Sequence, residues 1–346
     1  MTYLRLSGVV ESDIDAVEAW LAAGDVGPVV IATSGSSGTP KDVVLSREAV
    51  LASARASAAR LAGSGPWLLA LPSSYVAGLN VIVRSLVAGF RPEVLGDWPL
   101  SRHAGHGGGF GFISVVPTQL HRWLAEPGEA KALAGFHTVL VGGGPVDPSL
   151  RARAAEAGVN LVATYGMAET CGGCVYDGLP LDGVALALGT DGRVRIGGRV
   201  LFDGYAGDPV LTGEVLVDGW FLTSDAGRLD EDGRLQVLGR IDDMVVSGGV
   251  NVPAGVVAAR LREHPSVSAA EVVGVGDPEW GHRVVAVVSL VEPGEPLDLA
   301  VARDWVSERH PRSWAPPRLV VVPALPMLAN GKVDRLAVRE LAEEAG

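Results

Sequence analysis

The chain gathers most of its phosphate-binding chemistry into one turn. Residues 32–41 read Ala-Thr-Ser-Gly-Ser-Ser-Gly-Thr-Pro-Lys and follow an apolar run at 29–31. Glycines let backbone N–H groups approach an anion closely, hydroxyls donate further hydrogen bonds, and Lys41 adds a positive charge. A Ser/Gly-rich linker would have a similar composition. A linker seldom follows an apolar strand and precedes an Ala-rich helical pattern, here Ser46 to about Leu61, so the segment predicts a polyphosphate cradle.

Spacing excludes two better known phosphate loops. A Walker loop has four residues between its first glycine and the Gly-Lys pair, whereas Gly35 and Gly38 stand three apart and Thr39-Pro40 precede the lysine. The chain holds no GxGxxG dinucleotide fingerprint and no GxSxG nucleophile motif. The run His106-Gly-Gly-Gly109 is therefore not the oxyanion loop of an α/β-hydrolase, and we expect a mobile surface loop there.

Composition limits the kind of protein. With 346 residues, 48% of them hydrophobic and 20% charged, the chain predicts a soluble globular protein of two domains. The net charge of −12, without a long run of Lys or Arg, argues against a nucleic-acid surface. The first residues lack a signal-peptide pattern, and no stretch of eighteen or more residues is apolar throughout. We expect a cytoplasmic protein without membrane insertion, and its oligomeric state stays open, a homo-oligomer included.

The hydrophobic pattern predicts an α/β fold. Apolar runs alternate with helical patterns through the middle of the chain, with runs at 67–71, 112–116, 138–141 and 159–163 and helices at 117–124 and 148–157. This alternation is typical of βαβ units in a layered domain. Between residues 184 and 238, short β-like runs with Gly and Asp turns, such as 193–196 and 214–217, predict a β-rich subdomain.

A smaller unit is expected after Gly239. Its patterns predict helices near 253–263 and 297–308 and strands near 271–275 and 284–291. Near its end, residues 326–335 read Pro-Met-Leu-Ala-Asn-Gly-Lys-Val-Asp-Arg and place Lys332 in a loop. We therefore expect a large layered α/β domain with a β-rich subdomain at 1–240 and a small α+β C-terminal domain at 241–346.

The two cysteines stand in Cys171-Gly-Gly-Cys174, a spacing used in thiol redox and zinc sites. No second Cys or His pair is placed to complete a zinc site. The flanking glycines instead indicate that the backbone approaches another group closely, which makes the redox and zinc interpretations the less favoured ones.

Six motifs in a fixed order now point to a family. They are Ser34-Gly-Ser-Ser-Gly-Thr-Pro-Lys41, Gly142-Gly-Gly-Pro145, Tyr165-Gly-Met-Ala-Glu-Thr170, Thr223-Ser-Asp225, Gly239-Arg-Ile-Asp-Asp243 and Asn330-Gly-Lys332. In these motifs the sequence resembles the acyl-adenylate-forming enzymes of the acyl-CoA synthetase superfamily, over residues 29 to 335. A narrower stretch, 165–183, looks like actinobacterial o-succinylbenzoate-CoA ligases of menaquinone biosynthesis. Those ligases share the short segment of about thirty residues before the phosphate loop.

The resemblance implies a two-step reaction. A carboxylate, here o-succinylbenzoate, attacks the α-phosphate of ATP to give acyl-adenylate and pyrophosphate, and the thiol of coenzyme A then displaces AMP. Such chemistry asks the protein mainly to position reactants and neutralise charge. The implied ATP- and AMP-binding residues are Ser34, Ser36, Ser37, Gly38, Lys41, Gly143, Gly144, Pro145, Tyr165, Gly166, Asp225 and Arg240.

The resemblance also assigns particular roles. Glu169 resembles the Mg²⁺-linked carboxylate of the family, a hard oxygen ligand suited to an ion that bridges phosphates; the alternative is a solvated glutamate at a helix start. Lys332 would bridge the attacking carboxylate and the α-phosphate. The small domain would then rotate about Asp242 and present Gly248 and Gly249 to coenzyme A, although two glycines would also suit an ordinary tight turn.

Three positions depart from the family pattern. Ala168 lacks the hydroxyl that usually contacts the α-phosphate, a donor worth roughly 1–3 kcal/mol in the transition state. Tyr75 stands where the family commonly has His near the acyl pocket, and Asp42 follows the loop lysine, which is unfavourable for ATP unless its side chain points away. The acyl-pocket candidates are Tyr75, Gly78, Arg84 and Gly172.

Three hypotheses stay open at this point. The first is an o-succinylbenzoate-CoA ligase. The second is an adenylating enzyme of the same superfamily with another carboxylate or another thiol acceptor. The third is a nucleotide-binding protein that has lost catalysis through the changes at Asp42, Tyr75 and Ala168.

Overall fold

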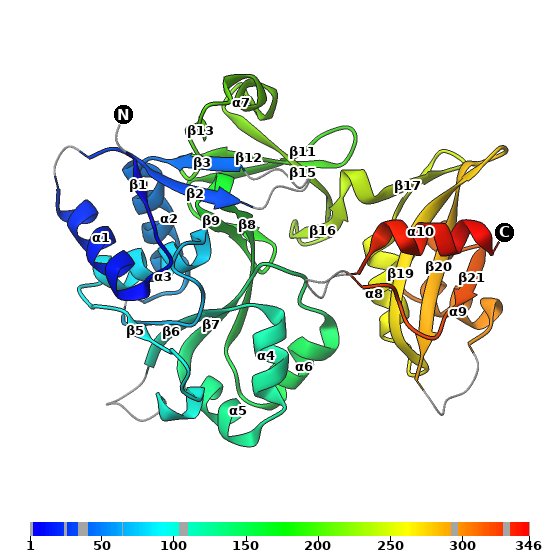
Figure 1. Cartoon of the computed structure of the whole chain (residues 1–346), viewed down its shortest axis with the longest axis horizontal. Helices are drawn as coiled ribbons and strands as arrows, with labels where there is room; N and C mark the ends of the chain where they lie inside the picture. Colours follow the sequence, from blue (N-terminus) through cyan, green and yellow to red (C-terminus); the bar gives the residue numbers. More distant parts are fainter. Residues whose placement is uncertain are drawn as a thin grey trace. The chain divides into compact units, whose positions relative to one another are not determined.

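The fold is seen in a computed structural model that describes residues 3–23, 26–33, 41–63, 65–103, 110–291, 297–327 and 333–345. The chain divides into two compact units, shown in Figure 1. Unit 1 contains Met1–Gly189, Val194–Thr223 and Leu229–Gln236, and unit 2 contains Thr190–Arg193, Ser224–Arg228 and Val237–Gly346. Within the described residues, no helix is long and apolar enough to cross a membrane.

Unit 1 is built around a seven-stranded sheet with the order β10-β9-β8-β7-β6-β4-β5. The strands are β4 (Trp67–Leu69), β5 (Glu93–Val94), β6 (Phe110–Val115), β7 (Phe136–Val141), β8 (Leu161–Met167), β9 (Gly172–Tyr176) and β10 (Leu179–Pro180). Strands β4 to β8 pair in parallel, while β9 and β10 pair antiparallel. Parallel strands need crossover connections, which helices supply here.

Helices cover both faces of this sheet. They are α1 (Val10–Ala22), α2 (Arg47–Arg60), α3 (Val76–Val87), α4 (Pro117–Leu124), α5 (Pro127–Ala134) and α6 (Pro148–Glu156), with the short turn η1 (Leu100–Arg102). Because successive strand side chains point to opposite faces, Phe112 packs into the cluster of α1 to α3, and its neighbour Ile113 packs into the cluster of α4 to α6. The result is a three-layer α/β domain with a core on each side of the sheet.

Two further sheets complete the architecture of this part of the chain. The first has the order β1-β2-β3-β13 and consists of β1 (Leu4–Arg5), β2 (Val29–Thr33), β3 (Lys41–Leu45) and β13 (Gly204–Tyr205). The second consists of β11 (Val184–Leu188), β12 (Arg193–Gly198), β14 (Leu216–Val217), β15 (Trp220–Leu229) and β16 (Leu235–Arg240). Short helical segments stand beside these strands, α7 (Pro209–Val215) and η2 (Ala168–Thr170).

Unit 2 contains a five-stranded sheet with helices on both faces (Figure 1). Its strands are β17 (Met244–Ser247), β18 (Val250–Pro253), β19 (Val267–Asp277), β20 (Gly281–Leu290) and β21 (Arg318–Val321). Its helical segments are η3 (Ile241–Asp243), α8 (Ala254–Arg262), α9 (Leu299–Ser307), η4 (Arg312–Trp314) and α10 (Arg335–Glu344). Val272 packs with α8 and α9, and the next residue, Val273, packs with α10.

The α/β class and the layered architecture expected from the sequence are confirmed. The expected helix at 117–124 has the observed bounds of α4, and most other expected elements differ by a few residues at their ends. One prediction is only half right, because the β-like run at 214–217 begins as the end of helix α7, and only Leu216–Val217 forms a strand, β14. Asp208 caps that helix, since its Oδ1 accepts the Leu211 N–H at 2.9 Å, and Pro209 occupies the first turn. These start signals outweigh the β-branched residues that follow.

Candidate functional site

Two of the predicted nucleotide-binding motifs meet at one edge of the parallel sheet in unit 1. The Gly142-Gly-Gly-Pro145 turn follows β7, and Glu169 in η2 follows β8, its neighbour in the sheet. Both therefore leave the carboxyl ends of adjacent parallel strands. That edge is where open α/β sheets bind ligands, so the topology brings together residues that stand far apart in the sequence.

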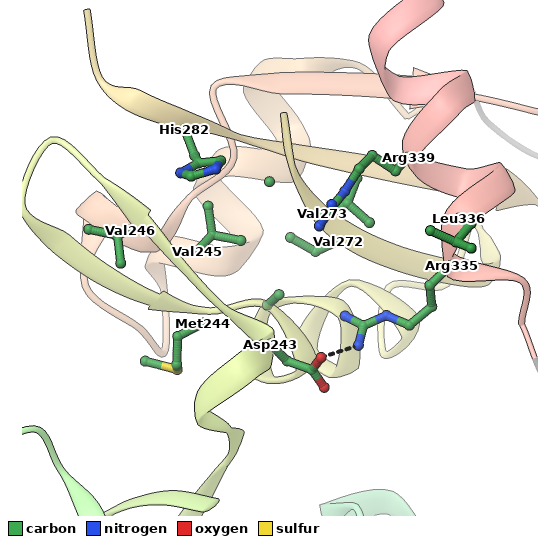
Figure 2. Close-up of a pocket in the computed structure, with 12 residues that line it drawn as sticks. Asp243, Met244, Val245, Val246, Val272, Val273, His282, Arg335, Leu336 and Arg339 are labelled. Atoms are coloured by element: carbon green, nitrogen blue, oxygen red, sulfur yellow. Dashed lines mark hydrogen bonds and ion pairs between the residues drawn. The ribbon is translucent and has the colours of Figure 1, made fainter. Parts of the chain in front are cut away.

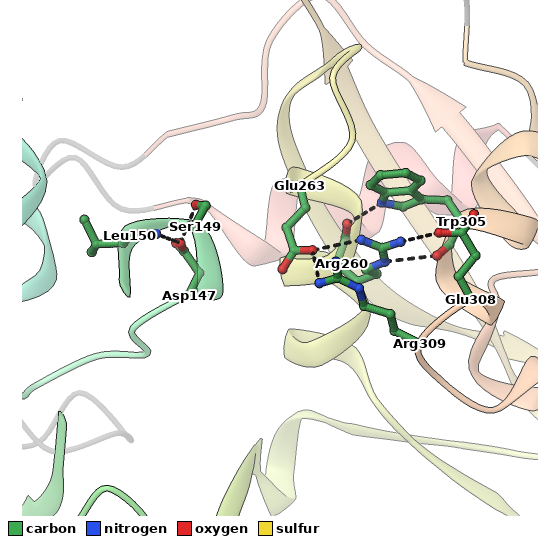
Figure 3. A network of polar contacts seen from close by, with 8 residues as sticks. All are labelled: Asp147, Ser149, Leu150, Arg260, Glu263, Trp305, Glu308 and Arg309. Atoms are coloured by element: carbon green, nitrogen blue, oxygen red, sulfur yellow. Dashed lines mark hydrogen bonds and ion pairs between the residues drawn. The ribbon is translucent and has the colours of Figure 1, made fainter. Parts of the chain in front are cut away.

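The glycine turn has a conformation that its sequence explains. Gly143 has φ +77°, a left-handed conformation that favours glycine, and Gly143, Gly144 and Pro145 are exposed. Just beyond the turn, Asp147 Oδ1 accepts the Leu150 N–H at 2.9 Å and the Ser149 hydroxyl at 2.7 Å, as Figure 3 shows. This cap fixes the start of α6 and with it the exit of the turn.

Glu169 is held by a segment that sequence reasoning did not single out. The Tyr205 hydroxyl donates a hydrogen bond of 2.8 Å to Glu169 Oε1. The backbone N–H of Phe202 also donates to the carbonyl oxygen of Glu169 at 2.9 Å. Residues 202–205 thus fix both the backbone and the carboxylate of this residue. Tyr205 carried only a weak sequence signal, one Gly-Tyr step in a β-rich segment.

Lys41 begins strand β3 on the same sheet face as Tyr205. The register pairs Tyr205 with Val43, and Lys41 lies two residues before Val43, so all three side chains share one face. The Lys41 ammonium lies 5.2 Å from the centroid of the Tyr205 ring, within the range of a cation–π contact. Lys41 and Glu169, two predicted site residues, thus contact the same phenol.

Asp42 points away from this face. It shares the opposite face of the sheet with Arg5, because Arg5 pairs with Val30, Val30 pairs with Val44, and Asp42 lies two residues before Val44. The Arg5 guanidinium lies 2.7 Å from the Asp42 carboxylate. Its hydrogen bond holds the pKa of Asp42 below the usual range. The Asp42 side chain therefore points away from Lys41, which is the condition for its compatibility with ATP.

Several predicted residues lie outside the described part of the chain or in unit 2. Ser34, Ser36, Ser37, Gly38 and Lys332 lie outside the described residues, as does the run 106–109. Asp225 in β15, Arg240 at the end of β16 and the backbone of Asp242 in η3 belong to unit 2. The role of Asp225 in ribose binding, that of Arg240 in ribose or phosphate binding and that of Asp242 as a hinge stay predictions.

The glycine pair in unit 2 has a packing partner. Gly248 has φ +55°, and a Cβ placed on it would lie 2.4 Å from Cε3 of Trp280. Its N–H donates to the carbonyl oxygen of Trp280 at 3.0 Å. Close packing therefore explains Gly248, and a role of Gly248 and Gly249 in coenzyme A binding stays a prediction.

Among the acyl-pocket candidates, Arg84 has the most unusual surroundings. Its side chain is 7% exposed and donates a hydrogen bond of 3.2 Å to the Tyr176 hydroxyl, while its guanidinium lies 5.2 Å from the Trp67 ring centroid. Arg84 Nε is buried and has no hydrogen-bond partner among the residues that the structure describes. Within the described residues it pairs with no carboxylate. A buried guanidinium normally has an anionic partner, and Arg84 has none among the described residues.

The other acyl-pocket candidates have simpler explanations. Gly78 and Gly172 lie where a Cβ would come within 2.1 Å of the Pro72 carbonyl oxygen and 2.3 Å of Asn80 Nδ2. Tyr75 precedes α3 and is 56% exposed. Ala168 is buried and contributes no hydroxyl.

Cys171 and Cys174 are free thiols in the described structure. Both thiols are buried, and burial raises the pKa of each, that of Cys174 to about 12. The described residues contain no cluster of three or more His, Cys, Asp or Glu that could hold a metal ion. The carbonyl oxygen of Cys171 accepts hydrogen bonds from Ser53 Oγ and Asn80 Nδ2, at 3.1 and 2.7 Å. Both cysteines belong to the core, and Asn80 approaches Gly172 closely, as the glycines indicated.

A cavity of about 430 Å³ lies in unit 2 between β17, β19 and α10, and Figure 2 shows its lining. Four of the twelve lining residues are valines, and Arg335 pairs with Asp243 in the same lining. Asp243, the last residue of the Gly239–Asp243 motif, lines this cavity, but none of the residues predicted to bind substrate or metal does. The prediction of the nucleotide site therefore rests on the motifs and not on the cavity.

A polar network in unit 2 is centred on Arg260, and its hydrogen bonds are made within that unit. Arg260 is 3% exposed and donates to Trp305 O, Glu263 and Glu308, and Trp305 Nε1 donates back to the Arg260 carbonyl oxygen (Figure 3). The guanidinium also lies 3.7 Å from the Trp305 ring centroid. Its donors are used between α8 and α9, so the network is structural.

Comparison with known proteins gives consistent matches along the chain. The family described as AMP-binding enzyme matches residues 16–224, and the AMP-binding enzyme C-terminal domain matches residues 257–332. A protein of Mycobacterium tuberculosis named "Probable 2-succinylbenzoate--CoA ligase" is 42% identical over 327 residues, 92% of this chain and 85% of its own length.

Solved structures agree with these matches. The o-succinylbenzoate CoA synthetase of Bacillus subtilis in complex with its acyl-adenylate intermediate has a TM-score of 0.76 and 28% identity, over 90% of this chain and 68% of its own. The same synthetase in complex with ATP and magnesium ion has a TM-score of 0.75 and 27% identity, over 91% and 69% of the two chains.

Proposed function

Because this chain belongs to the family of AMP-binding enzymes, we propose that it is an AMP-forming 2-succinylbenzoate-CoA ligase of menaquinone biosynthesis. The ligase name comes from relatives that align over nearly the whole chain. One geometric observation carries the nucleotide chemistry: Lys41 and Glu169 contact the same tyrosine near the carboxyl edge of the parallel sheet. A cation for phosphates and a carboxylate for a hard metal ion thus stand together.

The first step joins the acid to AMP. A carboxylate oxygen of 2-succinylbenzoate attacks the α-phosphorus of ATP, the bond to the bridging oxygen breaks, and pyrophosphate leaves. Lys41 binds the β- and γ-phosphates together with Ser34, Ser36, Ser37 and Gly38. Glu169 fits a Mg²⁺ ion, which when bound neutralises phosphate charge.

The nucleotide base and the lysine from unit 2 complete this step. Gly143, Gly144 and Pro145 wall the adenine, and Tyr165 with Gly166 forms its stacking surface. Asp225 binds the ribose hydroxyls, and Arg240 adds a contact to the ribose or to a phosphate. Lys332 places its ammonium between the attacking carboxylate and the α-phosphate, where negative charge accumulates in the transition state.

The second step transfers the acyl group. The thiol of coenzyme A loses its proton and attacks the acyl carbonyl, and AMP leaves with the electrons of the broken bond. A rotation of the small domain about Asp242 exchanges Lys332 for the loop of Gly248 and Gly249 between the two steps. The domain division at residues 240 and 241 is part of this proposal.

Arg84 is the residue that we assign to the second carboxylate of the substrate. Its guanidinium is buried, its Nε has no hydrogen-bond partner within the described part of the chain, and the two side chains that contact it, Tyr176 and Trp67, are neutral. A substrate carboxylate would supply the anion that this environment lacks. Tyr75, Gly78 and Gly172 would shape the rest of the acyl pocket.

The two other hypotheses are weaker after the structure. A non-catalytic nucleotide binder was suggested in part by Asp42, but Arg5 neutralises that carboxylate on the far face of the sheet. Another acid or another thiol acceptor differs from the proposed ligase only in substrate, and Arg84 favours an acid with a second negative charge. The cytoplasmic location expected from the sequence stays a prediction.

Pyrophosphate release with ATP, Mg²⁺ and 2-succinylbenzoate tests the proposal, with and without coenzyme A, followed by mass detection of acyl-AMP and acyl-CoA. We expect both products, and benzoate as a control acid lacking the second carboxylate should react far more slowly. Adenylate without thioester would indicate another acceptor. No product with this acid, despite binding of ATP, would contradict the assigned substrate.

A further inference from the structure

Tyr205 contacts two predicted site residues, Glu169 and Lys41, besides the residues that pack around it. It is 8% exposed and lies in β13, a strand of only two residues that pairs with β3. Its backbone N–H donates to the Thr212 hydroxyl at 2.9 Å, and its ring meets the Phe202 ring edge-on at 5.0 Å. These contacts with Thr212 and Phe202 fix the backbone and the ring of Tyr205 independently of its contacts with Glu169 and Lys41.

The phenol can only donate to Glu169. In a pair of a phenol and a carboxylate, the phenol hydroxyl is the donor, because an ionised carboxylate oxygen can only accept. The hydrogen bond of 2.8 Å uses one lone pair of Oε1. A carboxylate has about four such acceptor positions, which leaves Oε2 available to a metal ion. The hydrogen bond thus fixes the side-chain rotamer of Glu169 and leaves Oε2 available.

The ring of Tyr205 has a second use. The face of an aromatic ring attracts cations, and the Lys41 ammonium lies 5.2 Å from the ring centroid. Lysine has a long and flexible side chain, so a fixed surface beneath it reduces the conformations that it must lose on binding phosphate. One side chain therefore restrains both charged groups.

We infer that Tyr205 is a positioning residue for magnesium-bound ATP, which orients the Glu169 carboxylate through its hydroxyl and the Lys41 ammonium through its ring. The inference rests on the proposed function, since it takes Glu169 as the Mg²⁺-linked carboxylate and Lys41 as the phosphate lysine. It adds a residue that lies outside the six motifs, and it separates two roles within one side chain.

Two substitutions separate the two roles. Tyr205→Phe removes the hydroxyl and keeps the ring, so we expect the Mg²⁺ concentration for half-maximal thermal stabilisation by ATP to rise about tenfold. Stabilisation by AMP, which lacks the β- and γ-phosphates, should stay within about twofold, since the hydroxyl acts through the metal-linked carboxylate. Tyr205→Leu also removes the ring, and we expect it to weaken ATP binding measured without added Mg²⁺, a change that Tyr205→Phe does not show.

A double substitution tests whether Tyr205 acts through Glu169. In a Glu169→Gln background, Tyr205→Phe should change the Mg²⁺ requirement by less than about twofold, because residues that act as one unit are not additive. Tyr3→Phe removes a phenol hydroxyl from a 37% exposed tyrosine and is the matched control. Melting temperatures without ligand report any purely structural cost of each variant.

The outcomes are distinct. An unchanged Mg²⁺ requirement in Tyr205→Phe, or equal effects of that change with and without Glu169, would overturn the role of the hydroxyl. Equal ATP binding by Tyr205→Leu and Tyr205→Phe would overturn the role of the ring. A wild-type chain that binds ATP without any dependence on Mg²⁺ would overturn the inference as a whole. Failure to ligate 2-succinylbenzoate despite Mg²⁺-dependent binding of ATP would count against the proposed substrate alone.

Discussion

Arg5 and Asp42 form an ion pair of 2.7 Å on the sheet face opposite to Lys41. Three strands connect them, because β1 pairs in parallel with β2 and β2 pairs antiparallel with β3. The pair allows an acid to follow directly after Lys41, the lysine that we propose binds phosphates. Asp42 is one peptide away from Lys41 in the sequence, yet its charge is neutralised on the far side of the sheet.

Arg5→Ala should therefore affect ATP more than stability. The pair is largely exposed, with side-chain exposures of 53% and 34%, so we expect the free energy of unfolding to fall by less than about 1 kcal/mol. The unpaired Asp42 would oppose phosphate binding, and KM for ATP should rise about two- to fivefold at low salt and less at high salt. The double variant Arg5→Ala/Asp42→Asn should restore KM, and a KM that stays high in it would contradict this explanation.

Arg84→Lys should discriminate between substrates. The shorter, non-planar cation cannot reproduce a bidentate contact with a carboxylate, so we expect KM for 2-succinylbenzoate to rise about tenfold or more, while KM for ATP is unchanged. Arg60→Lys is the matched control, since Arg60 donates to the backbone carbonyls of Leu179 and Pro180 and pairs with Asp182 at 4.0 Å. Equal changes in both KM values would show that Arg84 has a structural role only.

Arg335→Ala should make the stability of unit 2 more sensitive to pH. Arg335 Nε lies 3.1 Å from Glu271 Oε1, and the same guanidinium pairs with Asp243. Burial raises the pKa of Glu271, and the charge of Arg335 opposes that rise. A carboxyl group with a raised pKa stabilises the folded state below its unfolded pKa, and this stability is lost as the pH rises through the folded pKa.

Without Arg335 the pKa of Glu271 should rise further, so the variant should lose more stability than the wild type as the pH rises from about 5 to 7. Tryptophan fluorescence during thermal unfolding at each pH measures this difference. Arg339→Ala is the control, since Arg339 lines the same cavity and shows no ion pair within the described residues. Parallel pH profiles for Arg335→Ala and the wild type would contradict the argument.

The two cysteines should be inert in the folded protein. Burial raises the pKa of both thiols, and the thiolate is the reactive form. We expect no reaction with a colorimetric disulfide reagent at about pH 8 over the time in which denatured protein reacts completely. Rapid labelling of one thiol under native conditions would show that the segment opens.

Lys332→Ala should separate the two steps of the reaction. We expect adenylate formation to fall about a hundredfold or more, because charge stabilisation in the first transition state is lost, and thioester formation from supplied acyl-adenylate to change little. The chain has three lysines, Lys41, Lys131 and Lys332, and the exposed Lys131 in α5 supplies the matched control Lys131→Ala. Equal losses in both steps would refute the assigned role.

The sequence by itself determined the class of the fold and the family. Short apolar runs that alternate with helical patterns predict parallel strands. A strand that is buried on both faces of a parallel sheet is hydrophobic along nearly its whole length. Short motifs with glycine, hydroxyl and charged residues identify the chemistry, since few residue types bind phosphates and Mg²⁺. A start signal such as Asp208-Pro209, by contrast, was missed among β-branched residues, because capping is a local contact that hydrophobic periodicity does not contain.

Only the tertiary structure decided which side chains meet. Tyr205 reaches Glu169 because β13 pairs with β3 and places its ring on the face of Lys41, and a register shift of one residue would turn it to the other face. Arg5 neutralises Asp42 for the same reason, through pairings between strands that are distant in the sequence. Arg84 carries a guanidinium that is buried beside Tyr176 and Trp67. Such contacts depend on long-range pairing and burial, so no local pattern of residues could have specified them.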